Sequence, residues 1–207
     1  MRQRGVQVIM LVLGVAALAV TDVAAQRRRG LVDVSPSHGR RGFWIEGGAG
    51  AGWESFKFDG DPYTESLTKP TFSLGLGGTV SPSLRLGVEG TIWVYHYFDD
   101  VAQVDVTESL SAILAVARFY PARSAGFFVK GGGGLGVSAA DVEFGDGTSE
   151  TGFAWMLGAG YEIQLSRSLF ITPSVEWFQH SFEQRGQDTL HERLVNLGVR
   201  LTWQPGR

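Results

Sequence analysis

The feature of this sequence that most constrains its fold is a two-residue alternation, which recurs in eight segments between residues 42 and 204. In the clearest segment, from Leu84 to Val94, apolar residues alternate mostly with glycine, polar or charged residues. Successive side chains of a β-strand point to opposite faces, so this period predicts strands with one apolar and one polar face. The apolar face is continuous enough to contact lipid, which is typical of a transmembrane β-barrel.

The segments have the length and the connections expected of such a barrel, since each is about ten residues or longer. They cover residues 42–56, 70–80, 84–94, about 106–120, 126–137, 151–164, 169 to about 180, and 194–203. Short turns alternate with longer, acid-rich loops, which is typical of bacterial outer-membrane barrels with periplasmic turns. The sequence therefore predicts an all-β, eight-stranded antiparallel up-and-down transmembrane β-barrel. In the fourth segment both alternating sets are apolar, so its inward face stays open.

The first 25 residues have the features of a secretory signal peptide. Arg2 and Arg4 precede a mostly apolar run that is too short for a membrane anchor, and small residues follow it. We expect residues 1–25 to be a signal peptide, 26–41 a flexible basic periplasmic linker and 42–207 the barrel domain. The sequence has no cysteine, which excludes disulfides and thiolate metal sites.

Charged residues on the polar faces are expected to point into the barrel and to form a network of ion pairs that plugs it, because an isolated buried charge is very costly. These residues are Glu46, Glu54, Arg85, Glu89, Lys130, Glu162, Glu176 and Arg200. Many glycines share the same faces, and they either leave a hydrated channel or make room for large side chains. Aromatic residues near the segment ends are expected at the membrane interfaces, namely Phe43, Trp44, Trp53, Trp155, Tyr161, Trp177 and Trp203.

The alternating segments and the last segment, Leu194–Trp203, resemble the small eight-stranded outer-membrane barrels of the OmpA and OmpX type. This resemblance implies a bacterial outer-membrane location, contact with membrane lipid and lipopolysaccharide, and recognition by the barrel-assembly machinery through the last strand. Family members commonly end on an aromatic residue, whereas four residues follow Trp203 here. We expect no cofactor, no metal and no nucleic-acid partner, and the partner of the loops is left open.

The expected function is a structural or surface-interaction role without catalysis. One alternative is a narrow pore for small solutes or ions. A second is a soluble lipocalin-like barrel that binds a ligand, with the apolar faces turned inward. A third and less favoured alternative is a lipid A acyl hydrolase, because His180 and Ser181 lie where the seventh segment ends. As neighbours in a strand they face opposite sides, which argues against a shared site.

Overall fold

The computed structural model describes residues 40–100, 103–122, 125–142, 147–182 and 189–205. The signal peptide and most of the basic linker expected from the sequence lie outside the described residues. Strands dominate the described part, with the bounds β1 (Phe43–Phe58), β2 (Leu67–Ser81), β3 (Leu84–Asp99), β4 (Val104–Phe119), β5 (Phe127–Val142), β6 (Thr148–Tyr161), β7 (Ile163–Gln164), β8 (Leu169–Phe182) and β9 (Leu190–Trp203). No helix in these residues is long and apolar enough to span a membrane.

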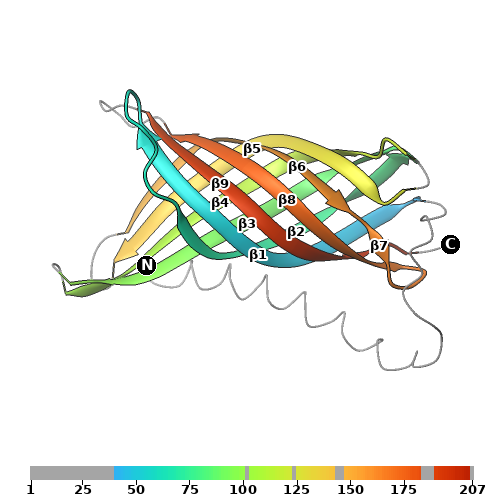
Figure 1. Cartoon of the computed structure of the whole chain (residues 1–207), viewed down its shortest axis with the longest axis horizontal. Coiled ribbons are helices and arrows are strands. Elements are labelled where there is room, and N and C mark those ends of the chain that lie inside the picture. Colours follow the sequence, from blue (N-terminus) through green and yellow to red (C-terminus); the bar gives the residue numbers. More distant parts are fainter. Residues whose placement is uncertain (1–39, 101–102, 123–124, 143–146, 183–188, 206–207) are drawn as a thin grey trace. The chain divides into compact units, whose positions relative to one another are not determined.

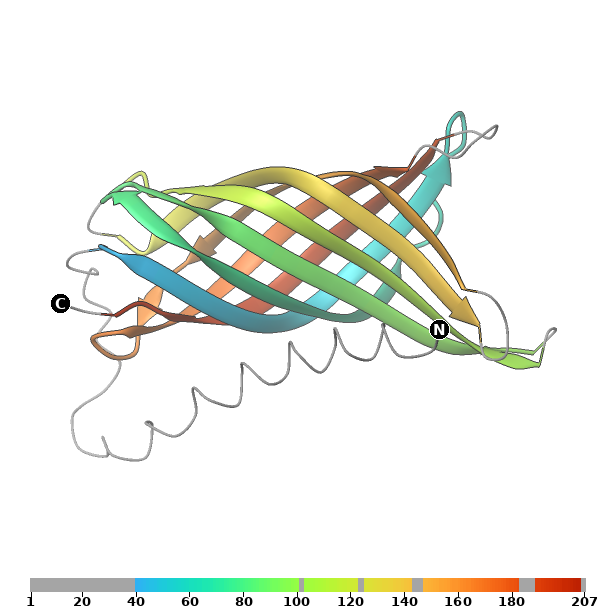
Figure 2. The same cartoon turned by 180° about the vertical axis from the view of Figure 1, so that it is seen from behind.

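The strands form one closed antiparallel barrel in which neighbours in sequence are neighbours in space (Figure 1). The ring closes where β1 pairs with β9, and β6 also pairs with β8. The two-residue β7 continues the line of β6, so the fold is the predicted eight-stranded barrel. The strands are tilted strongly against the long axis of the barrel, as both views show (Figures 1 and 2).

The apolar faces of the strands point outward. Ile113, Leu135 and Leu76 are each more than 60% exposed in the middle of their strands. Such an exterior suits lipid, and it contradicts the alternative of a soluble barrel with an apolar lumen. A closed barrel also gives each of its eight long strands two neighbours, so these strands leave no sheet edge open to the hydrocarbon.

The structure resolves the inward face of β4, which the pattern left open. Leu110, Leu114 and Val116 are buried inside the barrel, whereas Ile113 and Phe119 are exposed outside. Both sets are apolar because this strand contributes to an apolar layer in the lumen as well as to the outer surface. The layer consists of Trp93, Leu110, Ala112, Leu114, Val116, Ala154, Met156, Phe178, Phe182 and Leu194.

Candidate functional site

The middle of the lumen holds a central cluster of three carboxylates and three cations. Six strands contribute one residue each, namely Glu46, Glu89, Arg118, Lys130, Glu176 and Arg200. Every member is at most 3% exposed. An eight-stranded barrel has an interior just wide enough for side chains to fill, so a cluster drawn from six strands spans its cross-section.

Each cation in the central cluster bridges at least two carboxylates. Arg118 contacts Glu46 and Glu89, and Lys130 Nζ lies 2.6 Å from Glu89 and 2.8 Å from Glu176. Arg200 reaches all three carboxylates, at 2.6 to 3.0 Å. The three negative and three positive charges balance, which offsets much of the cost of removing them from water.

The two strands that contribute no charge at this level contribute glycine. Gly75 on β2 lies opposite Glu46 and Glu89, and Gly158 on β6 lies opposite Glu176. A Cβ at Gly75 would lie 3.1 Å from the Cγ atoms of both glutamates, and one at Gly158 would lie 3.0 Å from Cγ of Glu176. These inward glycines therefore make room for the charged side chains.

A second charged cluster lies at the end of the barrel with the short turns. Glu162 pairs with Arg85 at 2.5 Å and with Arg40 at 3.3 Å, and all three side chains are at most 1% exposed. Tyr120 donates a hydrogen bond of 2.7 Å to Glu162. Burial, followed by the Glu162 charge, raises the pKa of Tyr120, so its hydroxyl keeps the proton that it donates. Arg85 also donates to Gln204 at 2.5 Å.

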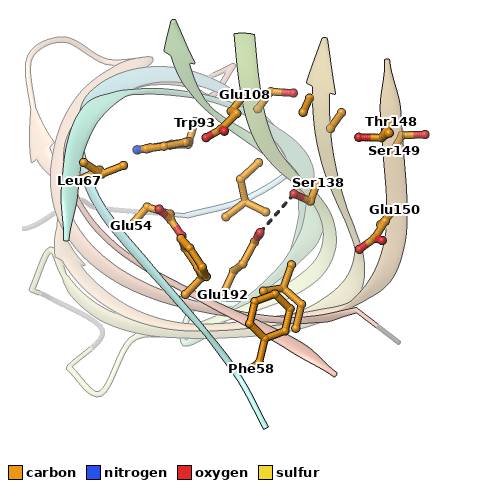
Figure 3. Close-up of a pocket in the computed structure, with 16 residues that line it drawn as sticks. Glu54, Phe58, Leu67, Trp93, Glu108, Ser138, Thr148, Ser149, Glu150 and Glu192 are labelled. Carbon is orange, nitrogen blue, oxygen red and sulfur yellow. Dashed lines mark hydrogen bonds between the residues drawn. The ribbon is translucent and has the colours of Figure 1, made fainter. Parts of the chain in front are cut away.

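A cavity of about 290 Å³ opens at the other end of the lumen, where the longer loops lie. Its lining combines the carboxylates of Glu54, Glu108, Glu150 and Glu192 with the apolar side chains of Phe56, Phe58, Leu67, Trp93, Leu110 and Leu190. No lysine or arginine is among the lining residues. Figure 3 shows Glu54, Glu108 and Glu192 around the interior of this mouth, with a hydrogen bond of 3.2 Å from Ser138 to Glu192. We call this cavity the acidic mouth.

The eight charged residues singled out in the sequence thus lie in three places. Glu46, Glu89, Lys130, Glu176 and Arg200 meet in the central cluster, and Arg85 meets Glu162 in the second cluster. Glu54 lies in the acidic mouth, and no described cation forms an ion pair with it.

Sequence reasoning missed two residues of the charged clusters. Arg118 lies on the strand whose two faces are both apolar, so the alternation does not single it out, although a charge at this position has to point inward. Arg40 falls within the expected flexible linker, yet its side chain is buried and donates a 2.6 Å hydrogen bond to the carbonyl of Ala125. No periodicity marks Arg40, because it precedes the first strand.

The prediction for one aromatic residue is wrong. Trp44 is fully buried in the lumen, where the Arg118 guanidinium lies 4.5 Å from its ring centre. It immediately follows the outward Phe43, and the alternation of a strand turns it to the other face. The other aromatics singled out lie on the outer surface, namely Phe43, Trp53, Trp155, Tyr161, Trp177 and Trp203. That they mark the membrane interfaces stays a prediction.

His180 and Ser181 lie on opposite faces of β8. His180 is buried inside the barrel between Phe178 and Phe182, with ring centres 6.4 and 6.1 Å away. Ser181 points outward and hydrogen-bonds to His191 on the neighbouring strand β9. Within the described part of the chain, no three His, Asp or Glu side chains converge as metal ligands would.

Comparison with known proteins places the chain in a family. Residues 10–202 match the family described as outer membrane protein beta-barrel domain. The chain belongs to this family. It is therefore a small β-barrel protein of the bacterial outer membrane, in contact with lipid. No curated protein sequence matches it.

Several solved structures have a similar fold. Neisserial surface protein A is 14% identical, with a TM-score of 0.53, and the match covers 77% of this chain and 96% of that one. Ail of Yersinia pestis, in complex with the heparin analogue sucrose octasulfate, is 18% identical (TM-score 0.46; 77% and 99% covered). OprG of Pseudomonas aeruginosa is 13% identical (TM-score 0.44; 80% and 98% covered). At these identities the likeness concerns the fold alone.

Proposed function

We propose that this protein is a closed outer-membrane barrel that acts through its surface rather than as a conduit. The observation that carries this proposal is the central cluster, in which six buried charged side chains from six strands contact one another across the lumen. The apolar layer lies on the side of the central cluster that faces the longer loops. The second charged cluster lies on the side that faces the short turns. Three successive layers of side chains leave the inward glycines without a channel to line.

The alternative of a narrow pore rests on these glycines, and their surroundings favour the closed barrel. A Cβ at Gly87 would lie 2.6 Å from the ring of Trp44, and one at Gly160 would lie 2.6 Å from the ring of Phe128. A Cβ at Gly136 would lie 2.6 Å from the ring of His180. The space released by each missing side chain is therefore taken by a large ring from another strand.

A closed lumen leaves the acidic mouth as the part of the interior that is open to a partner. Four carboxylates without a lysine or arginine in the lining favour a positively charged ligand, and the aromatic and aliphatic lining favours one with an apolar portion. We therefore propose that the acidic mouth binds a cationic, partly apolar ligand at the cell surface.

Conductance in a planar lipid bilayer tests the closed barrel. The folded chain should give no ion channels. Replacing one charge of each sign, Glu89→Ala with Arg200→Ala, should open a water path through the central cluster and produce conductance. Glu108→Ala, a matched change at the mouth, should leave the bilayer silent. Reproducible single channels from the unmodified chain would contradict the proposal.

A further inference from the structure

The outer wall of the barrel carries a chain of hydrogen bonds that the proposed function does not use. The Ser181 hydroxyl lies 3.2 Å from Nδ1 of His191, and Nε2 of the same ring lies 3.0 Å from Oδ1 of Asp59. The His191 side chain is 26% exposed and that of Asp59 is 56% exposed. The three residues are therefore connected to one another and are open to the outside.

The barrel register brings these residues together. Ser181 on β8 is the cross-strand partner of His191 on β9, which in turn is the partner of Lys57 on β1. Asp59 follows directly after the end of β1 at Phe58. The row therefore runs across three adjacent strands near the end of the barrel with the longer loops.

When the His191 ring is neutral, its two hydrogen-bond partners assign a role to each ring nitrogen. An ionised Asp59 can only accept a hydrogen bond, so Nε2 of His191 carries the proton. Nδ1 is then the unprotonated nitrogen, and it accepts a hydrogen bond from the Ser181 hydroxyl. A serine hydroxyl held by a histidine base, which is itself oriented by a carboxylate, is the arrangement that activates a serine nucleophile.

A groove lies on the same wall, towards the middle of the barrel. It has a volume of about 320 Å³ and is lined by Trp53, Ser55, Ser66, Trp177, Arg193 and Val195. Its apolar part is a cross-strand row in which Val195 lies between Trp53 and Trp177. Arg193 lies one row closer to Ser181, and successive rows are about 7 Å apart because each step covers two residues.

The side chains on these rows suit the chemical groups of a membrane lipid. Two tryptophans and a valine suit an acyl chain, whereas Arg193 and Lys57 supply positive charge beside the serine row. Such charges attract a phosphate group. The ligand chemistry is therefore an ester-linked acyl chain on a phosphate-bearing lipid, and it reaches the site from the membrane.

We propose that Ser181 and His191 hydrolyse acyl esters of such lipids, with Asp59 as a positioning residue. The Ser181 oxygen bonds to the ester carbonyl carbon while its proton passes to Nδ1 of His191. The bond from that carbon to the lipid alcohol oxygen then breaks, and the alcohol leaves with the proton. Water attacks the acyl-serine in the same way, which releases a fatty acid and restores the serine. This inference departs from the expectation of no catalysis, and it does not depend on the closed lumen.

His96, on the same barrel, also lies between a hydroxyl group and a carboxylate and can be compared with His191. Nδ1 of His96 lies 3.0 Å from the Thr107 hydroxyl, and its Nε2 lies 3.6 Å from Asp105. Thr107 carries a secondary hydroxyl group, unlike Ser181. The distance from His96 to the Asp105 carboxylate is too long for a hydrogen bond, and the His96 side chain is 63% exposed. His96→Gln is therefore a matched control for changes at His191.

The test uses the full chain folded in vesicles, with fatty-acid release followed by mass spectrometry. One set of vesicles contains phosphatidylglycerol and the other contains lipid A, so that the two sources of the ester are distinguished. Release from at least one lipid is expected, and Ser181→Ala and His191→Gln should each reduce it about a thousandfold. His96→Gln should leave it unchanged. A fluorophosphonate probe should label Ser181 of the unmodified chain, as read by peptide mass spectrometry.

Asp59 is tested through its effect on His191 rather than through loss of activity alone. Asp59→Asn should lower kcat with little change in KM, because an amide can donate to Nε2 and so favours the wrong tautomer. Asp59→Glu should restore most of kcat. Equal fatty-acid release by the unmodified chain and Ser181→Ala in both lipids, or absence of the probe from Ser181, would overturn the proposal.

Discussion

The charge balance of the central cluster makes a quantitative prediction about stability. Arg118→Met leaves three carboxylates with two cations, all in a layer that is at most 3% exposed. Removing one partner of a buried pair costs about 3–5 kcal/mol, because the other charge stays buried without compensation. Glu46→Gln should have a cost of similar size. The double variant keeps the charges balanced, so its loss should fall short of the sum of the two single losses by about 2 kcal/mol or more.

The measurement is equilibrium unfolding in urea with the protein in lipid vesicles, followed by tryptophan fluorescence. Arg167→Met is the control, because Arg167 is an exposed arginine in a short turn and its loss should change the free energy of unfolding by less than about 0.5 kcal/mol. If the two single losses simply add, or if Arg118→Met costs less than about 1 kcal/mol, the cluster does not act as a coupled, charge-balanced unit.

Two further predictions concern the packing of the lumen and the acidic mouth. Gly77→Ala should destabilise the barrel by about 1–3 kcal/mol, because its Cβ would meet backbone of β3 and lie 2.6 Å from the Trp44 ring. Gly78→Ala meets nothing within 4 Å, so urea unfolding should show no loss, and equal losses at both positions would refute the packing role. Replacing Glu54 and Glu192 by glutamine should weaken the binding of phenethylammonium, measured by calorimetry, about tenfold, equivalent to about 1.4 kcal/mol. Unchanged affinity would remove the mouth from the proposed function.

Periodicity alone predicted the number of strands, their order and the outward face of most of them, since the side-chain period of a strand is set by backbone geometry. Periodicity did not determine the inward face of β4, because both of its faces are apolar. The prediction for Trp44 was wrong because it rested on the position of this residue near the end of its segment and not on the alternation of faces. Trp44 lies two residues before Glu46 and therefore shares its inward face. Arg118 shares the face of Leu114, and the cost of a charge in lipid would have fixed that face as inward.

Contacts between distant segments could not be predicted in this way. Ser181 meets His191 through the register of β8 against β9, and Asp59 joins them from beyond the end of β1. The alternation within a strand says which face a residue takes, but it does not say which residue lies beside it on the next strand. The same limit applies to Arg40, which reaches Glu162 from outside the repeating pattern.

The filled lumen separates the chemistry of this barrel into two places of opposite charge. The acidic mouth offers carboxylates such as Glu54 and Glu192 to a cation, whereas the outer wall offers Arg193 and Lys57 to a phosphate. The barrel wall lies between the two places, because successive residues of a strand point alternately into the lumen and to the outside. Changes at the mouth should therefore leave lipid hydrolysis unaltered, and Ser181→Ala should leave cation binding unaltered. If either change affects both activities, the mouth and the wall belong to a single site, and the separation by the wall is wrong.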